Sequence, residues 1–230
     1  MFSDTDCDAF LQRMKLHADG DFAAILNMDR LDFLSEQAPF SSEDDICETN
    51  RLMRNLMGAP RLVSVLETLQ GNEVVGLMSQ MLFKEAGSKY AGQAWNPHQD
   101  NSYPRNENKQ YLTINLFLAD SDMSNGTLYI YPGSHKEDIL PYKPVVSYRE
   151  QGDEIGTNPG NDVEVPTQYE KVDVEFKKGD TFILHGNVIH GSYANESPDR
   201  SRPLIQFTYI TKGEDFIPGN TAKRMAISLH

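Results

Sequence analysis

Two separate segments of the chain carry residue types that could bind one metal ion. His98 and Asp100 are two positions apart, and in an extended segment side chains at that spacing point to the same face. An imidazole and a carboxylate could therefore reach a common ion. The third ligand that we expect is His190, far downstream. Two histidines and one carboxylate on one face of an iron(II) ion leave its other positions open for small ligands.

A second histidine close to His190 is the alternative ligand. His185 lies five residues before His190, so the two side chains would point to opposite faces of one strand. We therefore assign His185 to packing or hydrogen bonding. A His-x-Asp pair alone is weak support for a metal site, and the prediction rests on its combination with His190 and a downstream arginine.

That arginine is Arg202, which opens the predicted strand over residues 202–211. A dicarboxylate such as 2-oxoglutarate could chelate the metal through its keto-acid end and present its distal carboxylate to a planar, bidentate cation. Arg200 has the same strand parity but lies in a predicted turn, so we keep it as the alternative. The hydroxyls of Ser192 and Thr113 could donate to the same carboxylate.

Five further residues are placed by their positions in a substrate pocket, and each could equally be packing or solvated surface. They are Lys84, Trp95, Tyr103, Arg105 and Asn115. If Lys84 and Arg105 face the mouth of the cavity, they favour a substrate with a carboxylate or a phosphonate. If they face water, they say nothing about the substrate.

The elements that position these residues follow two periodicities. Apolar residues recur at three- and four-residue spacing over residues 8–14, 22–34 and 61–69, and a helix start with a hydroxyl cap is predicted at 41–45. The period changes to two after Gly71. We therefore expect a helical layer over residues 1–72 and a β barrel over residues 73–212.

The predicted strands occupy residues 74–83, 111–119, 127–131, 181–184 and 202–211. In the strand 111–119 one face is aliphatic and the other is chemically mixed, as expected where a barrel wall separates helices from a lumen that houses a site. Residues 140–174 are rich in proline and glycine, which indicates a long insertion that is either a binding loop or a surface excursion. Residues 213–230 form a C-terminal tail, and the whole chain 1–230 is expected to be a single domain.

Composition excludes several classes of protein. The chain has 230 residues and a formal net charge of −13, so its field repels nucleic acids and anionic membranes. Its two cysteines, Cys7 and Cys47, lack the spacing of a metal site or a disulfide framework. The first residues lack the pattern of a signal peptide. We expect a cytoplasmic protein, a monomer or a homodimer, that acts on a small molecule.

The order of several motifs resembles the phytanoyl-CoA dioxygenase family of iron(II) and 2-oxoglutarate-dependent oxygenases. The resemblance spans residues 74–211 and rests on His98-Gln99-Asp100, Asn125-Gly126-Thr127-Leu128, Pro132-Gly133-Ser134-His135, Gly179-Asp180, His190-Gly191-Ser192 and Arg202. It implies a double-stranded β-helix, a jelly-roll barrel of the cupin type, flanked by N-terminal helices. It also implies that His98, Asp100 and His190 bind iron, and that Arg202 and Ser192 hold 2-oxoglutarate.

By this resemblance the chain is a dioxygenase that needs iron(II), 2-oxoglutarate and O2, with ascorbate as the reductant in vitro. The implied reaction hydroxylates an unactivated C–H bond of a small organic substrate and releases succinate and CO2. Related halogenases have a small residue in place of the carboxylate, so Asp100 favours hydroxylation. Desaturation, epimerisation and ring closure stay open, as does the substrate.

Two other classes of function compete with this interpretation. One is a cupin-type isomerase or hydrolase that uses another metal without 2-oxoglutarate, and such a protein has no need for Arg202 as a buried carboxylate clamp. The other is a catalytically silent barrel that only binds a ligand. The complete set of His98, Asp100 and His190 argues against the silent barrel, because loss of a ligand is the expected mark of such a protein.

Overall fold

The computed structural model describes residues 2–17, 26–27, 51–87, 90–92, 94–144, 161–219 and 224–230. Its helices are α1 (Asp4–His17), a helical segment over 51–57 and α4 (Pro60–Gln70), with short 3-10 turns η1 (Tyr90–Gly92), η2 (Asp100–Ser102) and η3 (Ser134–Lys136). No helix in these ranges has both the length and the apolar character needed to cross a membrane.

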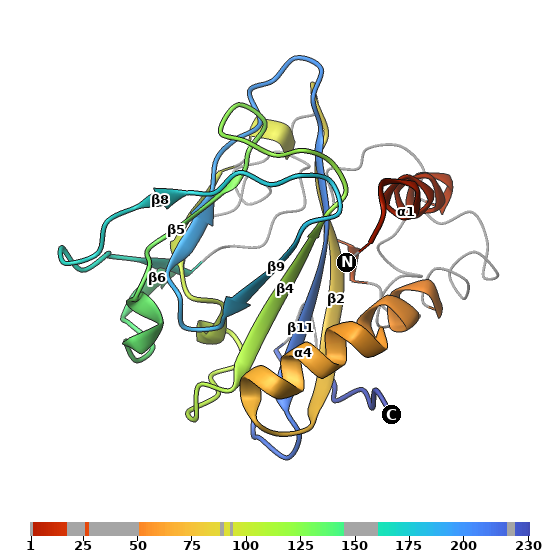
Figure 1. Cartoon of the computed structure of the whole chain (residues 1–230). Coiled ribbons are helices and arrows are strands. Elements are labelled where there is room, and N and C mark those ends of the chain that lie inside the picture. Colours follow the sequence, from red (N-terminus) through yellow and green to blue (C-terminus); the bar gives the residue numbers. More distant parts are fainter. Residues whose placement is uncertain are drawn as a thin grey trace.

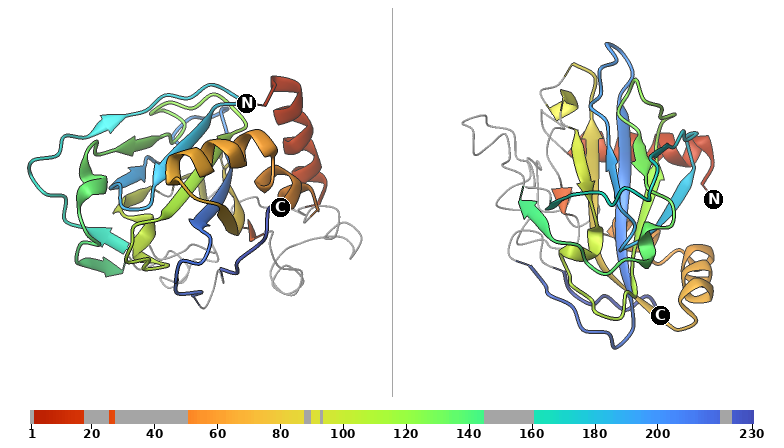
Figure 2. Two further views of the ribbon diagram at one scale, coloured as in Figure 1. Left: turned by 60° about the horizontal axis from the view of Figure 1, so that its bottom comes forward. Right: turned by 90° about the vertical axis from the view of Figure 1, so that its left-hand side faces the viewer.

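Most of the strands form two antiparallel sheets that face each other across a cavity (Figures 1 and 2). The larger sheet has the order β1-β2-β11-β4-β9, with β1 (Leu26–Asn27), β2 (Val74–Lys84), β11 (Arg202–Thr211), β4 (Tyr111–Phe117) and β9 (Thr181–His185). The smaller has the order β3-β10-β5-β8, with β3 (Trp95–His98), β10 (His190–Ser192), β5 (Leu128–Ile130) and β8 (Val172–Asp173). This arrangement is the jelly-roll fold expected from the sequence.

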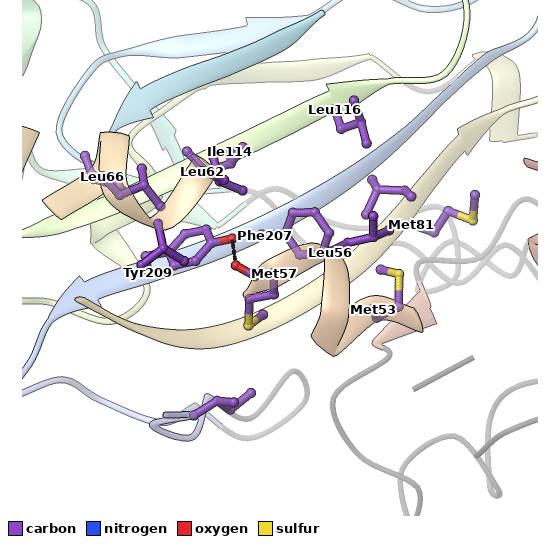
Figure 3. Close-up of a cluster of buried hydrophobic side chains, with 14 of the residues drawn as sticks. Met53, Leu56, Met57, Leu62, Leu66, Met81, Ile114, Leu116, Phe207 and Tyr209 are labelled. Carbon is purple, nitrogen blue, oxygen red and sulfur yellow. Dashed lines mark hydrogen bonds between the residues drawn. The ribbon is translucent and has the colours of Figure 1, made fainter. Parts of the chain in front are cut away.

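The outer face of the larger sheet packs against helices, as Figures 1 and 3 show. Helix α4 begins with a proline in its first turn and is capped after Gln70 by Gly71, whose left-handed φ of 70° suits glycine. Leu62 and Leu66 of this helix join a buried apolar cluster with Phe207 of β11 and Ile114 of β4. The Tyr209 hydroxyl also donates to the carbonyl of Met57 over 2.9 Å. Helices and sheet therefore share one core, which holds the barrel strands in register.

Most of the predicted elements are confirmed, and two predictions need correction. Within the helix predicted over 22–34, Leu26 and Asn27 instead form β1, paired with β2. The insertion predicted at 140–174 contains strands at both ends: β6 (Tyr142–Pro144) pairs with β7 (Asn161–Val163), and β8 joins the smaller sheet. The sequence lacks a period there because these strands have only two or three residues. The helix start predicted at 41–45 and residues 145–160 lie outside the described residues.

Candidate active site

Adjacent strands of the smaller sheet bring the predicted metal ligands together. His98 ends β3, Gln99 is extended, and Asp100 begins the η2 turn. His190 begins β10 and lies opposite His98 in the antiparallel register. Gly191 follows His190 in β10 and must be glycine, because a Cβ there would collide with the Tyr129 hydroxyl of β5 and the Trp95 carbonyl of β3.

The side chain of Gln99 fixes the turn that presents Asp100. It is fully buried, and its amide nitrogen donates to the carbonyls of Asn187 and Asp138 over 2.9 and 3.1 Å. Its amide oxygen accepts from the backbone of Leu140 over 2.8 Å. The residue between the two predicted ligands therefore fixes the turn by hydrogen bonds to two other segments of the chain, residues 138–140 and Asn187.

The three predicted ligands converge on one point. The Nε2 atom of His98 is 3.5 Å from one Asp100 carboxylate oxygen, and Nε2 of His190 is 3.7 Å from the other. One ligand atom from each residue lies within 4.8 Å of the other two. An ion bonded at about 2.1 Å can bridge ligand atoms up to about 4.2 Å apart, so small movements suffice to close the three atoms on one ion.

Both histidines are oriented for metal binding by backbone carbonyls. His98 Nδ1 lies 2.8 Å from the carbonyl of Asn96, and His190 Nδ1 lies 3.1 Å from that of Val188. Because a carbonyl only accepts, each Nδ1 carries the proton and each Nε2 presents its lone pair toward Asp100. This support of the other ring nitrogen is typical of histidines that bind metals.

The three groups shift one another's pKa values. Burial alone would raise the pKa of Asp100, but attraction to His190 and His98 in their protonated forms, with a contribution from the Thr113 hydroxyl, holds it well below its usual range. Burial lowers the pKa of His190. For His98 the effect of burial is outweighed by Asp100, which raises the pKa. The carboxylate is therefore ionised at neutral pH, as a ligand must be.

The donor set fits an iron(II) ion. Oδ2 of Asp100 is buried and accepts no hydrogen bond of normal geometry, an arrangement that costs free energy unless a cation completes it. Two imidazoles and one carboxylate on one side, with a cavity on the other, match the coordination of non-haem iron(II) oxygenases better than the closed sites of structural zinc.

Arg202 lies in a buried cationic group with Lys84. The two residues are register partners on β11 and β2, and both side chains are almost fully buried. Arg202 Nε donates to the carbonyl of Gly126 over 3.0 Å, while Lys84 Nζ donates to Ser192 Oγ over 2.9 Å and to the carbonyl of Tyr193. Burial, and then repulsion from Arg202, lowers the pKa of Lys84 well below its ordinary value. An anionic ligand would offset both effects.

Glycine at position 126 is required by this cationic group. Its φ is +89°, and a Cβ there would stand 3.0 Å from the Lys84 side chain and 3.0 Å from the carbonyl of Tyr193. The Asn-Gly-Thr motif noted in the sequence thus lets the chain pass close to Lys84 while its carbonyl orients Arg202. Arg200 is outside this group, because it is exposed and paired with Asp122 over 2.7 Å.

The triad and Arg202 line the same cavity, of about 260 Å³. Among the predicted substrate residues, Trp95, Tyr103 and Asn115 line it. Lys84 and Arg105 do not: Lys84 lies beneath the wall, and Arg105 is exposed and donates to the Tyr142 hydroxyl over 2.6 Å. They are therefore not at the cavity mouth, where they would have indicated an anionic substrate.

Thr113 and the remaining histidines occupy other positions. Thr113 is fully buried beside Asp100 and is not part of the cavity lining. The ring of His185 lies 5.6 Å from that of His135, and its Nδ1 accepts the backbone N–H of Asn187 over 3.1 Å. His185 is thus a packed, hydrogen-bonded residue, as predicted, and belongs to neither the triad nor the cavity lining.

Several lining residues were not singled out from the sequence. A row of amides crosses the inner face of the larger sheet, where Gln80 donates to Gln206 and Gln206 donates to Asn115 over 3.3 Å. Gln206 is four residues after Arg202 on β11, so strand alternation puts both side chains on the same face. Arg224 also lines the cavity, but it lies in a tail without periodicity, and nothing in the sequence marked it.

Comparison with known proteins identifies a family and several relatives. Residues 1–204 match the family model of phytanoyl-CoA dioxygenase (PhyH). Phytanoyl-CoA dioxygenase 1 of Oryza sativa subsp. japonica is 29% identical over 161 residues, which cover 70% of this chain and 54% of the relative. A probable alpha-ketoglutarate-dependent hypophosphite dioxygenase of Stutzerimonas stutzeri is 25% identical over 187 residues, 74% of this chain and 62% of the relative. The chain thus spans little more than half the length of these relatives.

Solved structures share the fold. The non-haem alpha-ketoglutarate-dependent epimerase SnoN from nogalamycin biosynthesis superposes with a TM-score of 0.62 at 24% identity, over 91% of this chain and 75% of that one. The carbocyclase SnoK from the same biosynthesis gives a TM-score of 0.64 at 17% identity, over 100% and 88%. At such identities the likeness concerns the architecture alone.

Proposed function

Because the chain belongs to the phytanoyl-CoA dioxygenase family, we propose that it is an iron(II) and 2-oxoglutarate-dependent dioxygenase that hydroxylates a small organic molecule. The observation that carries the proposal is one cavity lined both by the triad of His98, Asp100 and His190 and by the buried cation Arg202. A metal site without a 2-oxo acid has no use for that cation.

In this proposal His98, Asp100 and His190 hold iron(II). Arg202 binds the distal carboxylate of 2-oxoglutarate as a planar, two-pronged donor. Ser192, which already accepts a hydrogen bond from Lys84, can turn its own hydroxyl proton toward the same carboxylate. When bound, iron and 2-oxoglutarate supply the oxidising chemistry, in which O2 is consumed, succinate and CO2 leave, and one oxygen atom enters a substrate C–H bond.

The chain's own contribution is orientation and exclusion of water. Gly126 and Lys84 hold the guanidinium and the hydroxyl that orient the co-substrate, and the carbonyls behind His98 and His190 hold the imidazoles. Aliphatic side chains, Leu82, Leu128 and Leu204, form part of the wall. A fixed set of donors in a partly apolar cavity lowers the cost of bringing the reactants together.

The size of the cavity limits the substrate. A volume of about 260 Å³ is below the roughly 300–1,000 Å³ of ordinary ligand pockets, and 2-oxoglutarate takes part of it. We therefore propose a small substrate. The net charge of −13 supports a function without nucleic acid or an anionic membrane, and the free, buried thiol of Cys7 is compatible with the proposed cytoplasmic location.

The proposal is tested by succinate release from the purified protein with iron(II), 2-oxoglutarate and ascorbate. We expect slow turnover without substrate, lost in Asp100→Ala and in Arg202→Ala. The matched control is Arg200→Ala, which removes an exposed arginine paired with Asp122 and should leave turnover unchanged. If the wild-type protein neither releases succinate nor binds 2-oxoglutarate with iron present, the proposed function is wrong and a cupin-type metal enzyme or a silent barrel takes its place.

A further inference from the structure

A second arginine reaches the cavity from the C-terminal tail, far from Arg202. The backbone of Arg224 donates to Pro218, and the next residue, Met225, donates to the carbonyl of Leu77. The backbone of Arg224 is therefore fixed beside the first half of β2. Arg202, in contrast, pairs with Lys84, which is the last residue of β2. Seven residues of strand separate the two places, which is about 23 Å at roughly 3.3 Å per residue. The two arginines therefore enter the cavity lining from backbone positions far apart along β2.

The guanidinium of Arg224 lies over the ring of Tyr103. Its central carbon lies 5.8 Å from the centroid of the Tyr103 ring, within the range of a cation–π contact. Burial, and then the Asp100 charge, raise the pKa of Tyr103, while Arg224 acts in the opposite direction. Burial also raises the pKa of Tyr111, and Arg224 again lowers it. Tyr103 thus lies within electrostatic reach of both the metal ligand Asp100 and Arg224.

Arg224 has a donor left over. Its Nε is buried and makes no hydrogen bond, which costs free energy in a partly apolar site. No carboxylate of the described residues forms an ion pair with it, whereas Arg200 and Lys212 pair with Asp122 and Glu73. A cation that lines a cavity with an unused buried donor is arranged to receive an oxyanion from a ligand.

We propose that Arg224 binds an anionic group, a carboxylate or a phospho group, of the prime substrate, an inference that rests on the function proposed above. Arg202 holds the co-substrate at one end, Arg224 holds the substrate acid at the other, and the triad acts on the part between. The wall between the two arginines includes Met78, Leu82 and Leu204. The substrate is therefore a small acid with an apolar body.

The test uses straight-chain carboxylates from acetate to octanoate, the corresponding neutral amides, and alkylphosphonates of the same lengths. Binding is measured by calorimetry on the iron(II)-loaded protein without O2 and with saturating 2-oxoglutarate, so that the Arg202 end is filled. For at least one chain length the wild-type protein should bind the acid about tenfold or more tightly than its amide, as expected for a charge-assisted hydrogen bond in a dry site. The relative affinities of carboxylates and phosphonates identify the acid.

Arg224→Gln should abolish the preference for the acid while the amide and 2-oxoglutarate still bind with wild-type affinity. Arg224→Lys keeps the charge without the planar group and should retain part of the preference. Arg200→Gln is the matched surface control and should behave as wild type. Amide binding in each variant reports that the cavity is intact, so a loss of acid binding cannot be assigned to misfolding.

Three results overturn the proposal. One is a wild-type protein that binds no acid of the series better than its amide. A second is an Arg224→Gln variant that keeps the preference. A third is an Arg224→Gln variant that loses 2-oxoglutarate affinity, which makes Arg224 a co-substrate residue. If 2-oxoglutarate does not bind even to the wild type, the proposed function fails, and the same acid series without 2-oxoglutarate, compared between Arg224→Gln and Arg202→Gln, still decides the role of Arg224.

Discussion

The two faces of the larger sheet differ in chemistry although they alternate residue by residue along the same strands. On β11, Ile205, Phe207 and Tyr209 point outward into the core shared with the helices, whereas Arg202, Leu204 and Gln206 line the cavity. The outer face is mostly apolar. The inner face carries a buried arginine and a row of amides, which a sheet evolved only for stability would avoid.

On a single strand, the side chains that stabilise the fold and those that bind ligands therefore point to opposite faces of the sheet. Outward side chains gain free energy from burial against the helices. Inward ones hold polar groups that need a ligand to complete them, as Asp100 Oδ2 illustrates across the cavity. Substitutions on the two faces should therefore have different effects. Outward ones should lower the free energy of unfolding, and inward ones should lower ligand affinity.

The largest effect is expected from removal of a ligand on the cavity side. Asp100→Ala should lower the affinity for iron(II) by more than the 10–100-fold typical of residues that only support a ligand, because it removes the negative charge of the triad. The metal-free protein should stay folded, since the outer core is untouched. Metal analysis after dialysis against buffered iron(II), beside circular dichroism, checks both. A variant that retains stoichiometric iron would contradict the assignment of Asp100.

Truncation of a core residue on the outer face should lower the stability of the fold. Phe207→Ala deletes a ring that is 1% exposed and should lower the free energy of unfolding by about 3–5 kcal/mol. Its neighbour Gln206 faces the cavity, so Gln206→Ala should cost about 1 kcal/mol or less. Urea denaturation of the three proteins measures the difference. Equal decreases in the free energy of unfolding of the two variants would contradict the assignment of stability to the outer face.

The buried residue Lys84, on the inner side, should make the free energy of unfolding depend on pH. Its pKa lies well below 10.5 in the folded protein, so between the folded-state pKa and 10.5 the unfolded chain holds more protons. The free energy of unfolding of the wild type should therefore rise with pH in that window, by up to about 1.4 kcal/mol per unit. Below the folded-state pKa this dependence is absent.

Lys84→Met keeps the volume and removes the proton, so its stability should lack this rise, and near neutral pH it should equal or exceed that of the wild type. Urea denaturation of both proteins across the pH series measures the difference. Parallel profiles would show that Lys84 titrates normally. The variant should also bind 2-oxoglutarate more weakly, because Ser192 loses its donor.

Much of the site could be predicted because its residues obey local rules. His98 and Asp100 point to one site because Gln99 between them is extended, although Asp100 itself begins a turn. The alternation that puts Gln206 on the face of Arg202 is a property of strands and is found in β11. The register that sets His190 opposite His98 was not predicted, since pairing between distant strands is not encoded in either segment alone.

What escaped prediction depends on long-range contacts. For Lys84 the sequence left open a pocket position, packing or solvated surface, because its burial follows from pairing with Arg202 and from Gly126, which are distant in the sequence. Arg224 enters the cavity because the tail returns to β2, with Ile227 bridged to Gly76. Strands β6, β7 and β8 are too short to produce a period. Such features are fixed by packing rather than by local pattern.

The central claim is that Arg202 and the triad serve one co-substrate, and anaerobic titration of 2-oxoglutarate into the iron(II)-loaded protein tests it most directly. Chelation of iron(II) by a 2-oxo acid produces a visible charge-transfer band, whose growth gives the dissociation constant. We predict a saturable band in the wild type, a dissociation constant raised about 100-fold in Arg202→Gln, and no change in Arg200→Gln. A wild-type protein without the band, or an Arg202→Gln variant with wild-type affinity, would contradict the account.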